Sequence, residues 1–170
     1  MPQVFDSEDS GMYFIRNNAF RIENSDVHNK VKSNGIKTVE FIRIIENRLH
    51  FVEAKKSLHD PQGGERAVRF FQEEIGEIRD KFIHSLNLFA SIKVGVNEAN
   101  FADDFVMPKN ILLVFLLVVK EHDEIQCKST YAALNSSLKK NMPHYWLHIW
   151  KPIIEVFGYE KAVKQNFVVE

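Results

Sequence analysis

The stretch VEFIRIIENRLHFVEAKKS, residues 39 to 57, decides the fold. Two runs rich in β-branched and aromatic residues flank a short polar segment, and this pattern is typical of a β-hairpin. We therefore predict one strand from Thr38 to Ile45 and a second from Leu49 to Lys56. The second strand carries two charged residues, Glu53 and Lys55, two positions apart. Because side chains alternate between the faces of a sheet, both charges lie on one face.

The length of the hairpin turn determines which charged residues face each other. If the turn is Glu46-Asn47, Glu40 lies directly opposite Glu53. If the turn is Asn47-Arg48, Glu40 lies opposite Lys55 and diagonal to Glu53. Either two-residue turn puts Glu40, Glu53 and Lys55 on one face, whereas a three-residue loop separates them unless a bulge restores the register.

The face that carries these charges is partly apolar. Phe51 on the second strand shares it, as do Ile42 and Ile44 on the first. The simplest interpretation is a solvent-exposed salt bridge across the two strands, which would contribute about 0.2–1 kcal/mol. A polar cluster at the end of an apolar face is more typical of a functional site at the edge of a sheet.

Glu40 and Glu53 would repel each other at this spacing, because the Cβ atoms of directly paired residues lie about 5 Å apart. A divalent cation is the natural compensation, and Mg²⁺ or Mn²⁺ prefers carboxylate oxygen and is often shared with a substrate phosphate. Lys55 would neutralise developing charge or orient a metal-bound water. We therefore predict that Glu40, Glu53 and Lys55 form a catalytic, metal-dependent site for phosphodiester hydrolysis.

The pattern of Glu40 followed thirteen positions later by Glu53-Ala54-Lys55 resembles the PD-(D/E)XK nuclease superfamily, which has the restriction-endonuclease-like fold. Glu53-Ala54-Lys55 matches the acid-x-lysine element of that family. Glu40 stands where the family more often has an aspartate after a proline, and Val39 precedes it here, so this half of the motif matches loosely. The resemblance covers about residues 22 to 120.

The resemblance implies further site residues beyond the two carboxylates. The backbone carbonyl of Ala54 would be a third metal ligand. An acid from the first helical region would add to the site, with Glu23 the nearest candidate and Asp26 the second. A glutamine on the helix after the lysine would also contribute, and Gln72 has that position, although an ordinary helix-surface residue is the simpler interpretation.

The rest of the chain predicts a mixed α/β fold. Apolar residues at three- and four-residue steps predict a long amphipathic helix over residues 65–92, and an apolar run predicts a central strand over 111–119. The remaining expected elements are a helix over 129–141, a strand over 153–157 and a helix over 159–165. His144, Trp146, His148 and Trp150 alternate, which suggests another strand with one ring-rich face. We expect residues 1–170 to form a single nuclease-like domain, a central mixed sheet flanked by helices.

Composition narrows the function classes. Lys and Arg total 22 and Asp and Glu total 23, which leaves a net charge of −1 and no global basic field to attract nucleic acid. The single cysteine, Cys127, forms no internal disulfide, which fits a reducing, cytoplasmic setting. Residues 1–10 lack the pattern of a signal peptide, and the longest apolar run, 111–119, is too short to span a bilayer, so we expect no membrane segment.

Together these patterns predict a Mg²⁺- or Mn²⁺-dependent nuclease acting on nucleic acid, with DNA favoured over RNA. The alternative is a catalytically inactive nuclease-fold protein that acts as a binding or assembly module. A homodimer formed through the aromatic C-terminal segment is a further expectation.

Overall fold

The computed structural model describes residues 4–7, 10–121 and 128–169, so Cys127 lies outside the described residues. The strands are β1 (Val4–Ser7), β2 (Met12–Ile15), β3 (Ala19–Phe20), β4 (Phe41–Ile45), β5 (Arg48–Lys55), β6 (Leu112–Val119) and β7 (Ile153–Gly158). The helices are α1 (Asp26–Val31), α2 (Glu65–Lys93), α3 (Lys128–Asn141), α4 (His144–Trp150) and α5 (Tyr159–Lys164), with 3₁₀ turns η1 (Ile22–Asn24) and η2 (Lys32–Asn34). None of the helices in the described ranges is long and apolar enough to cross a membrane.

A five-stranded mixed sheet organises the chain, in the order β3-β4-β5-β6-β7. The β3-β4 and β4-β5 pairs are antiparallel, whereas β5-β6 and β6-β7 are parallel. The long helix α2 connects β5 to β6, as a parallel pair requires. The expected mixed α/β class with a central sheet is therefore confirmed. The structure also contains a separate two-stranded sheet, β1-β2.

The predicted hairpin is β4-β5, and its turn contains two residues. Ile45 pairs with Arg48, so the turn is Glu46-Asn47, the first of the two alternatives. Glu46 has a φ of 55°, in the left-handed region that two-residue hairpin turns use at their first central position. This turn fixes the register along the whole hairpin.

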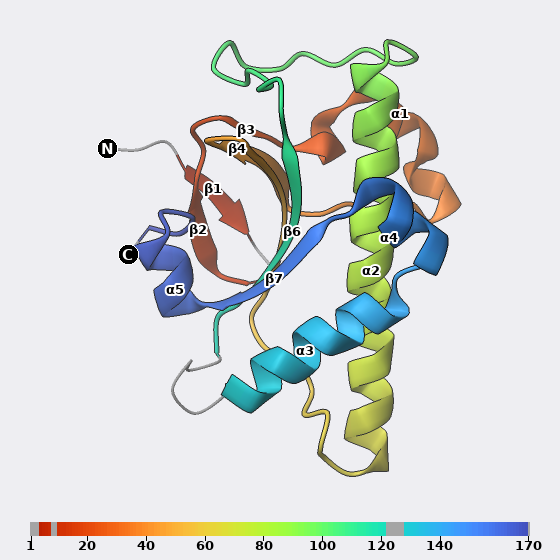
Figure 1. Cartoon of the computed structure of the whole chain (residues 1–170), viewed down its shortest axis with the longest axis vertical. Helices are drawn as coiled ribbons and strands as arrows, with labels where there is room; N and C mark the ends of the chain where they lie inside the picture. The colour runs from red at the N-terminus through yellow and green to blue at the C-terminus, as the bar shows by residue number, and fades with distance from the viewer. Residues whose placement is uncertain (1–3, 8–9, 122–127, 170) are drawn as a thin grey trace.

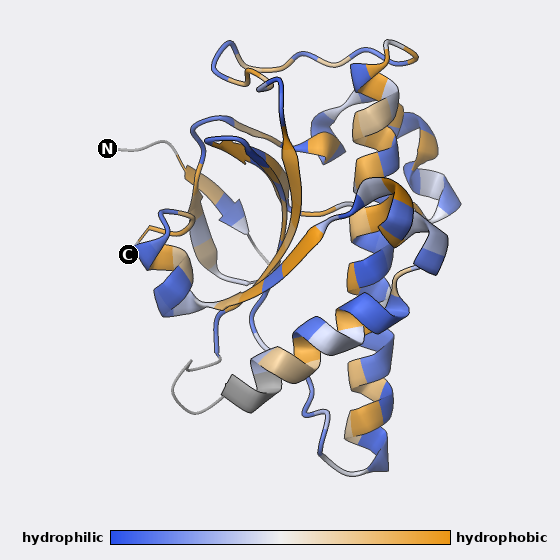
Figure 2. Cartoon of the chain, in the orientation of Figure 1, coloured by the Kyte–Doolittle hydropathy of each residue, from blue (hydrophilic) through white to orange (hydrophobic). Residues whose placement is uncertain are grey.

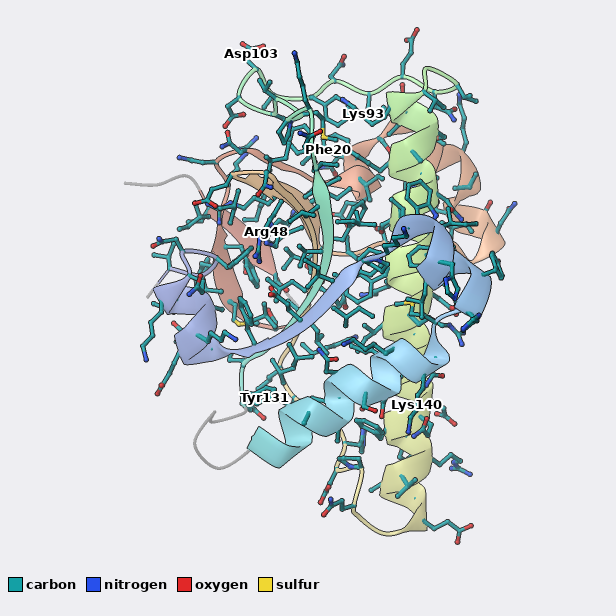
Figure 3. The ribbon with its side chains drawn as sticks, in the orientation of Figure 1. Phe20, Arg48, Lys93, Asp103, Tyr131 and Lys140 are labelled. Carbon is teal, nitrogen blue, oxygen red and sulfur yellow. The ribbon has the colours of Figure 1, made fainter. Side chains whose placement is uncertain are left out.

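The central sheet is covered on both faces. Helices α2, α3 and α4 lie on one face, and the β1-β2 hairpin and α5 lie on the other (Figure 1). Strand β6 is buried on both sides, with Phe115 and Leu117 in the core under α2 and Leu116 and Val118 in the opposite core. Figure 2 shows the apolar strands at the centre and α2 banded between apolar and polar residues. The prediction of a central strand in this segment is confirmed.

Helix α2 packs its apolar stripe onto the sheet. Phe71, Ile75, Ile78 and Phe82 are buried at three- and four-residue spacing. The observed bounds, Glu65–Lys93, agree with the expected 65–92. This stripe places one turn of α2 directly over the carboxyl-terminal half of β5.

The expected strand over the alternating histidines and tryptophans is wrong, because residues 144 to 150 form helix α4. Pro143 occupies the N-cap position, and a proline at the start of a helix is favourable because the first N–H groups have no helical partner. Trp146 is buried, whereas His144, His148 and Trp150, which would share its face in a strand, are exposed, so the burial does not follow the two-residue period of a strand.

Candidate functional site

Glu53 is the centre of a buried charged cluster at the end of β5. Its side chain is 0% exposed and faces α2 from between the apolar residues of the sheet. The Oε1 atom of Glu53 accepts a hydrogen bond from Lys81 Nζ of α2 at 2.7 Å. Lys55 Nζ lies 3.7 Å from the same oxygen. The prediction that Glu53 and Lys55 share one face is confirmed.

The other carboxylate oxygen of Glu53 has no partner. Among the residues that the structure describes, no donor reaches Glu53 Oε2, although the atom is buried. A buried carboxylate oxygen without a hydrogen bond destabilises the folded chain more than an unpaired neutral acceptor does. The reason is that its negative charge is also removed from water. The orphaned oxygen therefore marks a position where a cation or donor would be strongly stabilising.

Burial raises the pKa of Glu53 to about 7. Lys81 and Lys55 both act to lower this pKa, whereas the charge of Glu40 acts to raise it. Desolvation dominates because the group lies in a low-dielectric interior with one oxygen unpaired.

Glu40 lies immediately before β4 and next to Glu53. The pairing of β4 with β5 ends at Phe41 and Val52, and Glu40 lies in a bend one residue before it, close enough for its charge to act on Glu53. Glu40 is half-buried, and its charge raises the pKa of Glu53 and of Lys81. The Val39 N–H donates to Ser85 Oγ of α2 at 2.9 Å, and this buried bond fixes the backbone beside Glu40.

Helix α2 supplies two charged residues that the sequence did not indicate as part of the site. Burial alone would lower the pKa of Lys81, but the charge of Glu53 and its hydrogen bond outweigh burial and raise it. Burial alone would raise the pKa of Glu77, but the hydrogen bond from Lys37 and the charges of Lys55, Lys37 and Lys81 lower it. Lys37 Nζ lies 3.2 Å from Glu77 Oε1. The cluster thus contains three carboxylates and three lysines.

Of the further residues that the resemblance implied, Glu23 and Gln72 lie away from the cluster around Glu53. Ala54 offers only its backbone to that cluster. Glu23 is exposed in η1, and its Oε1 accepts from Arg21 at 3.3 Å. Gln72 is exposed on α2, and five residues separate it from Glu77, which turns it by about 140° around the helix. Ala54 is buried with its side chain in the core opposite α2, and it pairs with Val118 of β6 in the parallel ladder.

The carboxylates of Glu40 and Glu53 are the side chains of this cluster that could hold a cation. Within the described ranges, no three Asp, Glu, His or Cys side chains gather closely enough to form an all-protein metal cage. Mg²⁺ does not need such a cage, because it is usually held by one or two carboxylates together with waters and substrate phosphate. Glu40 and Glu53, with the unpartnered Oε2, provide that kind of hard oxygen site.

The charges immediately around the site balance. Glu40, Glu53 and Glu77 are matched by Lys37, Lys55 and Lys81, the groups whose charges act on one another. Neither a basic groove nor an acidic surround is present in this cluster. Any nucleic acid would therefore be held by a few local phosphate contacts, and its affinity would be low.

Comparison with protein-family models, with curated proteins and with solved structures finds no match to this chain.

Proposed function

We propose that the chain is a metal-dependent nuclease that hydrolyses phosphodiester bonds in nucleic acid, with DNA favoured over RNA. The observation that carries the proposal is the buried carboxylate of Glu53, with one oxygen that has no hydrogen-bond partner among the described residues and with the charge of Glu40 acting on it. An apolar core gains nothing from two adjacent acids at this position, whereas a divalent cation would satisfy both.

The order of elements supports a restriction-endonuclease-like core. An antiparallel hairpin, β4-β5, is followed by α2 and then by β6, which is parallel to β5. The acid-x-lysine element lies on β5, and Glu40 immediately precedes β4, so both elements belong to the hairpin segment that the resemblance to PD-(D/E)XK nucleases implies. We extend the fold assignment to that superfamily as part of the proposal.

The roles of the residues follow from their chemistry. Glu40, Glu53 and the backbone carbonyl of Ala54 would hold Mg²⁺ or Mn²⁺, and the bound ion would act as a Lewis acid toward a phosphodiester. Lys55, whose Nζ lies 3.7 Å from Glu53 Oε1, would hold a water or stabilise negative charge on the phosphate. Lys81 offsets the charge of Glu53 in the ion-free chain.

A binding or assembly module built on the same fold is the second candidate. It is favoured by the direct contact between Lys81 Nζ and Glu53 Oε1 at 2.7 Å, since a lysine that pairs with the buried carboxylate can take the place of a metal ion. In that case another copy of the chain would be the natural partner, through the exposed Tyr145 and Ile149 of α4. The near-neutral composition and single cysteine fit action in the cytoplasm under either proposal.

Cleavage of plasmid DNA, single-stranded DNA and RNA with Mg²⁺ or Mn²⁺ tests the nuclease proposal. Wild type should cleave at least one substrate, and Lys55→Ala should lose the activity. Lys56→Ala is the matched control, because Lys56 is the next residue, is exposed and pairs with Glu121 away from the cluster. Equal cleavage by wild type and Lys55→Ala would place the activity elsewhere, and no cleavage by wild type would favour the binding module.

A further inference from the structure

His144 and His148 lie one helical turn apart on α4, and both side chains are exposed. Their rings meet edge to face with centroids 4.5 Å apart. The Nε2 atoms of the two rings approach to 3.4 Å. The two imidazoles thus direct the same nitrogen to one point on the surface.

The distance between these nitrogens matches that of two ligands on one tetrahedral ion. Zinc binds imidazole nitrogen at about 2.0–2.1 Å, so two nitrogens at the tetrahedral angle lie about 3.3–3.4 Å apart. A hydrogen bond between the rings is the competing explanation, but nitrogen-to-acceptor distances in such bonds centre near 2.9–3.0 Å. The observed 3.4 Å is longer than such hydrogen bonds and lies at the upper end of the metal-ligand range.

The helix that carries the pair is anchored between the two histidines. Trp146 is 4% exposed, and its ring stacks on Phe115 of β6 with centroids 5.3 Å apart. Leu147 packs against the same core. Because α4 cannot rotate without removing Trp146 from this core, both imidazoles are held on the outer side of the helix before any ion binds.

We propose that His144 and His148 form a surface site for a divalent transition-metal ion such as Zn²⁺, Ni²⁺ or Cu²⁺, with water at the remaining positions. Imidazole nitrogen suits these ions, whereas Mg²⁺ prefers oxygen. The site therefore differs in metal class from the cluster around Glu53 and does not depend on the proposed nuclease function.

Quenching of tryptophan fluorescence by Cu²⁺ measures binding at this site directly. The chain has two tryptophans, Trp146 and Trp150, and both lie on α4 beside the histidines. Untagged protein stripped with a chelator should show saturable quenching with one strong Cu²⁺ equivalent, and Zn²⁺ should displace Cu²⁺ while millimolar Mg²⁺ should not. Absence of saturable quenching in wild type, or displacement by Mg²⁺, would overturn the proposal.

Two variants separate this site from adventitious binding. His148→Ala should weaken Cu²⁺ by roughly tenfold or more, because the loss of even an outer-shell partner costs about 10–100-fold in metal affinity. The double variant His148→Ala, Ile149→His keeps two histidines but moves the second off the shared face, and it should bind as weakly as His148→Ala. Wild-type affinity in the double variant would refute the geometric argument. Glu53→Gln should bind Cu²⁺ normally, so failure here is distinguishable from failure of the nuclease proposal.

Discussion

Replacing Glu53 by glutamine should change how the stability of the protein depends on pH. The pKa of Glu53 is raised by burial from its ordinary value of 4.5 to about 7 in the folded chain. Between pH 4.5 and about pH 7, the Glu53 carboxyl is protonated in the folded chain and ionised in the unfolded chain. The free energy of unfolding therefore falls as the pH rises through this window. The contribution of Glu53 is fully present below pH 4.5 and is lost above pH 7.

The magnitude follows from the two pKa values. The interval from 4.5 to about 7, at about 1.4 kcal/mol per pKa unit, corresponds to about 3 kcal/mol. Glu53 is 0% exposed, so solvent does not screen this contribution to the free energy of unfolding. This loss runs opposite to ordinary acid denaturation, in which carboxylates stabilised by ion pairs lose stability as the pH falls.

Urea unfolding at half-unit intervals from pH 4.5 to 8, in the presence of a chelator, measures the effect. The difference in unfolding free energy between wild type and Glu53→Gln should drop by about 3 kcal/mol across the range. Glu73→Gln is the control, because that side chain is 64% exposed on the same helix and should give a curve parallel to wild type. Parallel curves for wild type and Glu53→Gln would refute the argument that burial dominates at this carboxyl.

Magnesium should counteract this loss if Glu53 binds the ion. At pH 8, Mg²⁺ at 100 times its dissociation constant should stabilise wild type by about 2.7 kcal/mol. Glu53→Gln should show little of this stabilisation, because its side chain has lost the carboxylate charge. Equal stabilisation of both proteins would place the ion away from Glu53.

Three further changes test the surroundings of the site by urea unfolding. Lys81→Met should destabilise the protein by about 3–5 kcal/mol at pH 8, because Glu53 loses the partner that lies 2.7 Å from its Oε1 atom. The destabilisation should be much smaller at pH 5. A destabilisation that does not depend on pH would contradict this reasoning. Ser85→Ala should cost about 1–3 kcal/mol, because it leaves the buried N–H of Val39 unpaired, and a neutral result would mean that this bond contributes nothing. Phe115→Ala should cost about 3–5 kcal/mol as a cavity in the core under α2, and a loss below 1 kcal/mol would show that the core collapses around it.

The hairpin shows how far the sequence alone determines the fold. The alternation of apolar and polar residues predicts both strands and the shared face of Glu53 and Lys55, because one buried face fixes the register of a strand. The choice between two turns was not predictable. It depends on Glu46 adopting a φ of 55°, a conformation that glutamate seldom takes and that no local pattern indicates.

The contribution of α2 to the site lies beyond sequence reasoning for a different reason. Glu73, Glu77 and Lys81 follow one another at four-residue steps and suggest one exposed row. In the structure Glu73 is 64% exposed whereas Lys81 is 12% exposed, because the row drifts around the helix and the helix crosses the sheet at an angle. The partner of a buried charge thus depends on helix packing, which periodicity does not determine.

Helix α4 illustrates the opposite error, in which a periodic pattern misled. Rings at every second position predict a strand, but Pro143 and a seven-residue length favour a short helix. Only Trp146 of that set is buried, so the alternation of rings did not reflect alternating burial.

An anomalous difference map from crystals grown at pH 8 and soaked in Mn²⁺ would show whether Glu40 and Glu53 bind a metal ion together. We expect a peak within about 2–2.5 Å of carboxylate oxygens of both residues, with Glu53 Oε2 among its ligands. The absence of a peak there, with Lys81 Nζ still 2.7 Å from Glu53 Oε1, would contradict the metal site and leave a closed ion pair in its place.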